Sequence, residues 1–141
     1  MRVRYLISEM WEAKDIHEIL DAVRFAIKYY KLEDAKSTLT VRLMNGKDEK
    51  VEASADRIKN KRYEVRLARA QIEDSLDAVL LALFHEMTHV KQFVHDGFIL
   101  YSNKAIWKNE PYQKDDYWLS PWEMEARAME RALVAAFDAT R

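Results

Sequence analysis

The sequence contains no cysteine, and only two glycines and two prolines occur among its 141 residues. Without cysteine the chain can form no disulfide, no thiolate metal site and no cysteine nucleophile, so any metal must be held by histidines and carboxylates. A chain of this length can bury a hydrophobic core without disulfides or a structural metal ion. We therefore expect one domain, residues 1–141, in which any bound metal is functional rather than structural.

The chain also lacks an excess of charge, because 23 Lys and Arg stand against 24 Asp and Glu and the net charge is -1. This balance argues against nucleic-acid binding driven by bulk charge and against a membrane-surface protein. Basic residues do gather between Arg57 and Arg69, but Asp56 and Glu64 lie among them, as is common on the solvent face of a strand. No stretch reaches transmembrane length. We expect a soluble, cytoplasmic protein with no nucleic-acid or membrane partner.

The feature that stands out is His85-Glu86-Met87-Thr88-His89, which lies inside an apolar run from Leu76 to Val94. The run predicts a long helix that begins after Ser75 as N-cap and ends before Gly97. Four residues make about one helical turn, so both imidazoles lie on one face and can bind one metal ion. Glu86 lies beside them, where it can take a proton from a metal-activated water. This arrangement predicts zinc-assisted hydrolysis.

The remaining patterns predict an α+β fold. Alternating polar and apolar residues predict short strands, and Asn45-Gly46 predicts a hairpin turn, so we expect a small, mostly antiparallel sheet. A capping box of Asp15 and Glu18 predicts the start of a first helix, and Ser120-Pro121 with Glu123 predicts the start of a last one. The strands are expected at 2–7, 38–43 and 62–67, and the outer helices at 15–31 and from 120 onward.

The segment 98–119 has no sustained period but is rich in aromatic residues, which argues for packing rather than disorder. We expect it to wall the cleft beside the two histidines. A tyrosine hydroxyl from this segment could stabilise the oxyanion of a tetrahedral intermediate. The aromatic residues are Tyr101, Trp107, Tyr112, Tyr117 and Trp118, of which the three tyrosines are the candidates.

A catalytic zinc needs a third protein ligand, for which the candidates are His95, Glu123 and Glu125. His95 has the spacing of the third histidine in metzincins, but the glycine that lets the chain leave the helix there is replaced by Gln92. The helix therefore continues and carries His95 about 240° around from His89, away from the metal. For His95 we favour either a helix-end histidine near the C-terminal dipole of the helix or a hydrogen bonder at the edge of the cleft.

The carboxylate candidates carry a resemblance to a known family. Glu123-Met124-Glu125-Ala126 follows the H-E-x-x-H helix as an E-x-x-A segment, and in this order the two motifs resemble gluzincins over residues 75–139. Minigluzincins, ImmA/IrrE-type peptidases and SprT-like proteins are the nearest groups. The resemblance implies a minimal zincin fold and a zinc metalloendopeptidase acting on protein or peptide substrates. It implies zinc on His85, His89 and Glu123, with Glu86 as general base.

Two departures from the gluzincin pattern matter. An acid often follows four residues after the ligand glutamate, but that position holds Arg127, so support for a histidine must come from elsewhere. SprT-like proteins usually use a third histidine, which this segment does not offer. Helix geometry alone leaves Glu123 and Glu125 both open, while the E-x-x-A alignment favours Glu123. The alternative function is a zincin-fold regulatory or protein-binding domain with little or latent peptidase activity. The aromatic segment, which could occlude the cleft, is the feature that favours this alternative.

Overall fold

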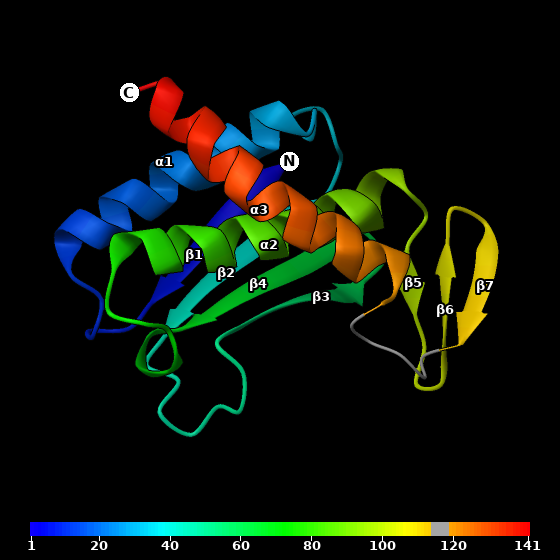
Figure 1. Ribbon diagram of the computed structural model, residues 1–141, viewed down its shortest axis with the longest axis horizontal. Coiled ribbons are helices and arrows are strands. Elements are labelled where there is room, and N and C mark those ends of the chain that lie inside the picture. Colours follow the sequence, from blue (N-terminus) through cyan, green and yellow to red (C-terminus); the bar gives the residue numbers. More distant parts are fainter. Residues whose placement is uncertain (114–118) are drawn as a thin grey trace.

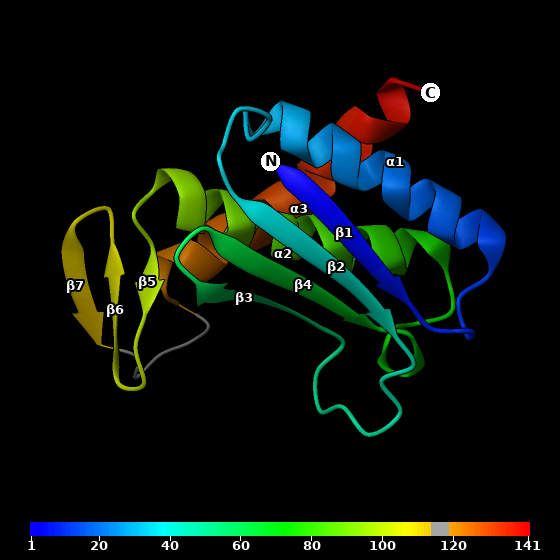
Figure 2. The same ribbon diagram turned by 180° about the vertical axis from the view of Figure 1, so that it is seen from behind.

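The computed structural model describes residues 1–113 and 119–141 and has an α+β architecture, as the sequence predicts. Three helices cover one face of a four-stranded sheet, and the opposite face of the sheet is open (Figures 1 and 2). A second, three-stranded sheet lies beside the end of the first (Figure 1). The helices are α1 (Ala13–Tyr29), α2 (Leu76–His95) and α3 (Pro121–Ala139), and the strands of the main sheet are β1 (Arg2–Ile7), β2 (Thr38–Met44), β3 (Ala53–Lys59) and β4 (Arg62–Ala68).

The main sheet has the strand order β1-β2-β4-β3, and the prediction that it is mostly antiparallel was wrong. β1 pairs with β2 and β2 pairs with β4 in parallel, and only β3 and β4 are antiparallel. The reason lies in the connection, because α1 joins β1 to β2 as a crossover, and strands joined in this way run parallel. The edge strand β3 was not predicted at all.

The predicted hairpin after Asn45-Gly46 was also wrong. Gly46 has φ +70°, and a Cβ placed there would lie 2.2 Å from the Cβ of Ala68, so only glycine fits this close approach. The chain then runs on to β3, which forms its hairpin with β4 rather than with β2. Lys61, with φ 61°, is at the turn of that hairpin. Gly46 therefore marks a packing contact between the chain after β2 and the end of β4.

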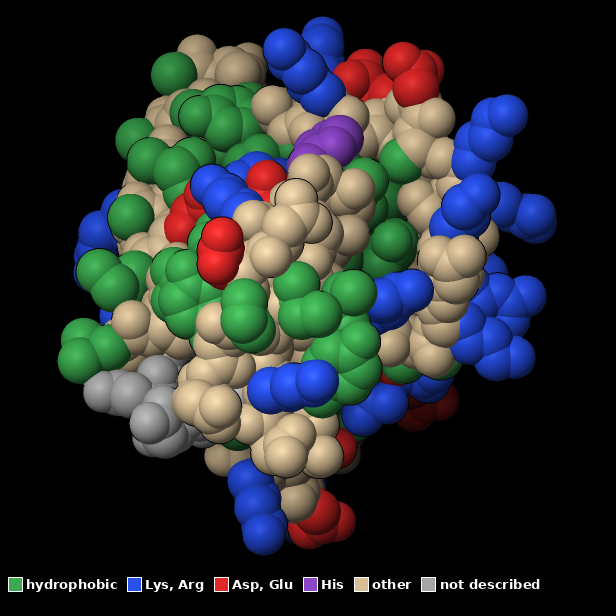
Figure 3. Space-filling model, turned by 90° about the vertical axis from the view of Figure 1, so that its right-hand side faces the viewer, with side chains coloured by type: hydrophobic (Ala, Val, Ile, Leu, Met, Phe, Trp, Pro, Cys, Tyr) green, Lys and Arg blue, Asp and Glu red, His purple; other side chains and the backbone are tan. Residues whose placement is uncertain are grey.

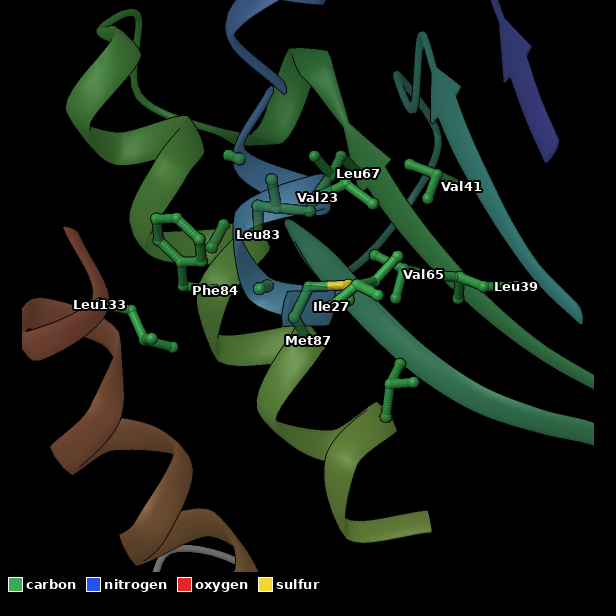
Figure 4. Close-up of a cluster of buried hydrophobic side chains, with 14 of the residues drawn as sticks. Val23, Ile27, Leu39, Val41, Val65, Leu67, Leu83, Phe84, Met87 and Leu133 are labelled. Atoms are coloured by element: carbon green, nitrogen blue, oxygen red, sulfur yellow. The ribbon is translucent and has the colours of Figure 1, made fainter. Parts of the chain in front are cut away.

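The core lies between the sheet and the helices. Side chains of α2 such as Leu83 and Met87 pack against the inward faces of β2 and β4, and Val23 and Ile27 of α1 close the same layer (Figure 4). Leu133 of α3 packs on the other side of α2. Because α2 lies between the sheet and α3, it is buried on two sides.

The ends of α2 confirm their predicted caps. The Ser75 hydroxyl accepts a hydrogen bond from the backbone N–H of Ala78, and Gly97 has φ +62° just beyond the helix. The capping box of the first helix was wrong, because α1 begins at Ala13 with Glu12 as N-cap and Asp15 lies inside the first turn. The helix ends at Tyr29, two residues before the predicted end.

The aromatic segment contains regular structure that its sequence did not predict. β5 (Ile99–Leu100), β6 (Lys104–Trp107) and β7 (Glu110–Gln113) form an antiparallel meander. Lys108 and Asn109 both have positive φ and form the two-residue turn between β6 and β7. None of the helices in the described part of the chain is long and apolar enough to cross a membrane.

Candidate metal centre

Two helices bring the predicted ligands together. His85 and His89 lie one turn apart on α2, and the first turn of α3 places the Glu123 carboxylate between their imidazoles. Nε2 of His85 is 3.1 Å from Oε1 of Glu123, and Nε2 of His89 is 3.0 Å from Oε2. One ligand atom from each residue lies within 4.8 Å of the other two. Glu123 is only 2% exposed, so its charge is enclosed by these groups.

Gln92 fixes the tautomer of His89. The amide Nε2 of Gln92 donates to the backbone carbonyl of Trp122 at 2.9 Å, and a carbonyl can only accept. The amide oxygen therefore faces His89, where it is 2.7 Å from Nδ1. Because that oxygen can only accept, His89 donates from Nδ1, and the Nε2 of the neutral ring keeps a lone pair directed toward Glu123.

Glu130 fixes the tautomer of His85 in the same way. Its carboxylate lies 2.8 Å from Nδ1 of His85 and accepts the Nδ1 proton. Carboxylates and amides in this position orient metal-ligating histidines and raise their basicity. The gluzincin pattern does not predict this support, because Arg127 occupies the position four residues past Glu123. Glu130 lies seven residues after Glu123, about two helical turns along the same face, so helical spacing could have found it.

The arrangement fits a divalent cation. When both Nδ1 atoms donate, the two neutral imidazoles direct the lone pairs of their Nε2 atoms to the same point as the Glu123 carboxylate. Such a buried group of acceptors is stable only when protons or a metal ion lie between its members. Two histidine nitrogens and a carboxylate oxygen form the His₂Glu donor set of catalytic zinc sites. The chain therefore offers a site at which bound metal and bound protons compete.

The charges of the site agree with this description. Burial lowers the pKa of His85, but the Glu123 hydrogen bond and the Glu86 charge oppose it and raise the pKa to about 9. The pKa of His89 is also raised, against its burial, by the same two glutamates. Burial raises the pKa of Glu123, but the hydrogen bonds to both imidazoles outweigh it and hold that pKa well below its usual range.

Glu86 lines a pocket beside the group formed by His85, His89 and Glu123, which we call the triad. The pocket has a volume of about 270 Å³, and His89, Glu123 and Glu86 share its wall with residues of β3. Glu86 is only 7% exposed, and its burial raises its pKa to about 7 against the lowering effect of the two histidines. A carboxylate with a pKa near neutrality is suited to general-base catalysis. The apolar part of the wall consists of Val51, Ala53, Ala55, Phe93, Phe98, Leu100 and Trp122.

The other two ligand candidates have different partners. Nε2 of His95 lies 2.9 Å from the carbonyl oxygen of Tyr30 and 3.1 Å from that of Lys31, so His95 joins α2 to the end of α1 and points away from the other two histidines, the latter as predicted. The Glu125 carboxylate accepts hydrogen bonds from Lys91 at 3.1 Å and from Gln92 at 2.9 Å. Neither side chain belongs to the convergent group of ligands.

The aromatic segment walls the pocket in part. Phe98 and Leu100 line it, while Trp107 packs behind them with ring centroids 5.8 Å from Phe98 and 6.3 Å from Trp122. Tyr101 and Tyr112, two of the predicted oxyanion candidates, are not among the lining residues. Tyr117 and Trp118 lie outside the described residues. Sequence reasoning missed the β3 side of the pocket because it missed β3.

Comparison with models of protein families, with curated proteins and with solved structures gave no match at the threshold used. What this site can do therefore has to be argued from its own donors, its burial and its surroundings.

Proposed function

We propose that this chain is a zinc-dependent metallopeptidase with a zincin-like fold. One observation carries the proposal: Nε2 of His85, Nε2 of His89 and the Glu123 carboxylate converge within 4.8 Å. Both Nδ1 atoms are tied to acceptors, so each Nε2 is presented as a ligand. The buried Glu86 lies beside this group, in a pocket wide enough to admit a side chain.

The residues divide the chemistry among themselves. His85, His89 and Glu123 hold the metal, and Gln92 and Glu130 keep the two imidazoles oriented. Zinc, when bound to these three ligands, would lower the pKa of a bound water to about 7 and would polarise a carbonyl oxygen. Glu86 accepts a proton from the attacking water and passes it to the leaving amine nitrogen. The products are a carboxylic acid and an amine.

The edge strand β3 supports a peptide as the substrate. Among the described residues, β3 pairs with β4 alone, so its other edge offers backbone N–H and C=O groups to an extended chain. Three consecutive residues of that strand, Ala53, Ser54 and Ala55, line the same pocket as Glu86 and His89. A peptide paired with β3 therefore passes the candidate metal centre.

Glu86→Gln tests the mechanism most directly. We expect this variant to keep one zinc per chain and to lose hydrolysis of an unfolded protein by about a hundredfold or more, since a general base contributes roughly 10² to 10⁴ in rate. Metal content is measured by elemental analysis and cleavage by the release of new amino termini. Glu73→Gln, at an exposed position before α2, is the matched control and should retain full activity.

Three results would contradict the proposal. Hydrolysis by Glu86→Gln at the wild-type rate would remove the general base. Zinc retained undiminished by both His85→Ala and His89→Ala would remove the metal centre. Stoichiometric zinc at the triad, with no cleavage of any unfolded protein, would leave a metal-binding domain and favour the regulatory alternative.

A further inference from the structure

The open face of the main sheet carries a concentration of arginines that the net charge of the chain conceals. This face lies opposite the helices (Figure 2) and forms the right-hand edge of Figure 3, where Lys and Arg side chains gather. It is hollowed over a volume of about 520 Å³. The charged residues that line the hollow are Arg2, Arg4, Arg42, Arg62, Arg66 and Glu64, a local charge of +4 in a chain whose net charge is -1.

Strand register explains how these residues come together. Side chains two residues apart on a strand point to the same face, and partners on neighbouring strands lie side by side. The parallel pairings of β1, β2 and β4 therefore build three rows on the open face, with threonines between the charges. The rows are Arg2, Thr38 and Arg62, then Arg4, Thr40 and Glu64, then Arg42 beside Arg66.

Glu64 organises part of this surface. Its side chain is only 7% exposed, and its two oxygens accept hydrogen bonds from Nε of Arg42 and Nε of Arg66, each at 2.9 Å. Both guanidiniums are thereby held in place while their terminal Nη groups remain available as donors. Among the residues that the structure describes, Arg2, Arg4 and Arg62 form no ion pair. Five guanidiniums are thus presented to solvent, two of them already oriented.

We propose that this surface binds a nucleic-acid duplex through its phosphates. Guanidinium groups bind phosphates with paired N–H donors, and hydroxyls such as those of Thr38 and Thr40 commonly add phosphate contacts. Arg62 and Arg66 lie four residues apart on β4, a span of about 13 Å. One strand of a duplex places about four phosphates along that length. The hollow as a whole carries a charge of +4, to which arginines of three strands contribute.

The surface favours a duplex over the other polyanions. An extended acidic peptide directs only every second side chain to one face, so it offers about two carboxylates over the same 13 Å. Single-stranded nucleic acids need exposed rings on which bases stack. The aromatic residue that lines the hollow, Tyr63, is buried and stacks on Phe93 beneath the sheet. The positive charge also continues past Arg2 and Arg62 into an adjoining hollow lined by Lys36 and Lys61.

Fluorescence anisotropy with a labelled 20-base-pair DNA duplex tests this proposal at several salt concentrations. For about four phosphate contacts, log K should fall with log[salt] with a slope of roughly -3.6. Replacing Arg2, Arg4 and Arg62 together by Gln should weaken binding about tenfold or more at 50 mM salt and reduce the slope by about 3. Two duplexes of unrelated sequence should bind equally, because phosphates carry no sequence information.

The matched control replaces Lys14, Lys28 and Arg131 by Gln, three exposed cations on α1 and α3. It removes the same charge from the helical side and should change affinity less than about twofold. Equal losses in the two triple variants, or a wild-type slope near zero, would overturn the proposal.

Binding of polyglutamate as tight as that of the duplex would instead identify an acidic protein as the partner. A chelator of zinc should leave duplex binding unchanged, so this test is independent of the proposed peptidase activity.

Discussion

Two glutamates in the first turns of α3 face α2 only two residues apart, yet their surroundings differ in kind. Glu125 contacts the Lys91 ammonium at 3.1 Å, and the same ammonium lies 2.8 Å from Asp96. Glu123 contacts two imidazoles whose Nδ1 protons are already directed elsewhere. Glu125 thus has a permanent cation as its partner, whereas Glu123 has partners that can bind either protons or a metal.

This difference separates a structural ion pair from a candidate metal centre more clearly than charge does. Both clusters contain a carboxylate of α3 that contacts α2, and the Glu125 carboxylate is the more exposed of the two. Once the imidazoles are neutral, the possible ligand atoms around Glu123 all direct lone pairs to one point, and those around Glu125 do not. Gln92 belongs to both clusters, because its oxygen faces His89 while its nitrogen donates to Glu125. It is the side chain through which a change in one cluster would reach the other.

The largest effect is expected from a matched pair of substitutions, Glu123→Gln and Glu125→Gln. Both remove one negative charge from α3 and keep the shape of the side chain. Glu123→Gln should weaken zinc binding by more than the roughly 100-fold that loss of an outer partner costs, because a metal ligand is removed. Glu125→Gln should change zinc affinity only a few-fold. Competition with a chromophoric chelator at pH 7 measures both affinities.

The reverse result, in which Glu125→Gln loses zinc and Glu123→Gln keeps it, would make Glu125 the ligand. Equal losses in the two variants would mean that the two clusters form one site.

Zinc should also raise the melting temperature of the wild-type chain, since a ligand at about 1,000 times its Kd stabilises the folded state by roughly 4 kcal/mol. The same addition should leave the melting temperature of Glu123→Gln nearly unchanged.

An intermediate effect is expected from Glu130→Ala. This substitution leaves the three ligands intact and removes only the acceptor that orients His85. Zinc affinity should fall about 10- to 100-fold, as is typical when an outer hydrogen-bond partner is lost. Arg131→Ala, at the exposed neighbouring position, is the control and should bind zinc like the wild type. A loss as large as that of Glu123→Gln would instead identify Glu130 as a ligand.

Local patterns predicted the α2 part of this molecule well, because caps and apolar periodicity are encoded within a few residues. The helix begins after Ser75 and ends before Gly97, and because it is unbroken it carries His95 away from the ligand group, as expected. The gluzincin-like order of motifs favoured Glu123, and the fold brings Glu123 to His85 and His89. Its role as a zinc ligand stays a prediction.

Sheet order and long-range pairing could not be read from the same patterns. β3 shows little alternation of buried and exposed residues, because it is an edge strand that lines a pocket, and it therefore went unpredicted. Parallel pairing of β1 with β2 follows from the strand-helix-strand order, because a crossover helix returns the chain in the same direction. The arginines of the open face come from three separate strands, so a net charge could not reveal their concentration.

The smallest effect is expected from Lys91→Met, which breaks the ion pairs of Glu125 and keeps most of the apolar stem of the side chain. The pairs are partly exposed, so the free energy of unfolding should fall by about 1 kcal/mol, measured by urea denaturation. Zinc affinity should change less than about threefold, because the ligands and the bond between Gln92 and His89 are retained. If Lys91→Met loses zinc as completely as Glu123→Gln does, the Lys91 cluster is itself part of the metal centre. Unchanged zinc affinity with the small loss of stability would establish that Glu125 serves the packing of α3 on α2.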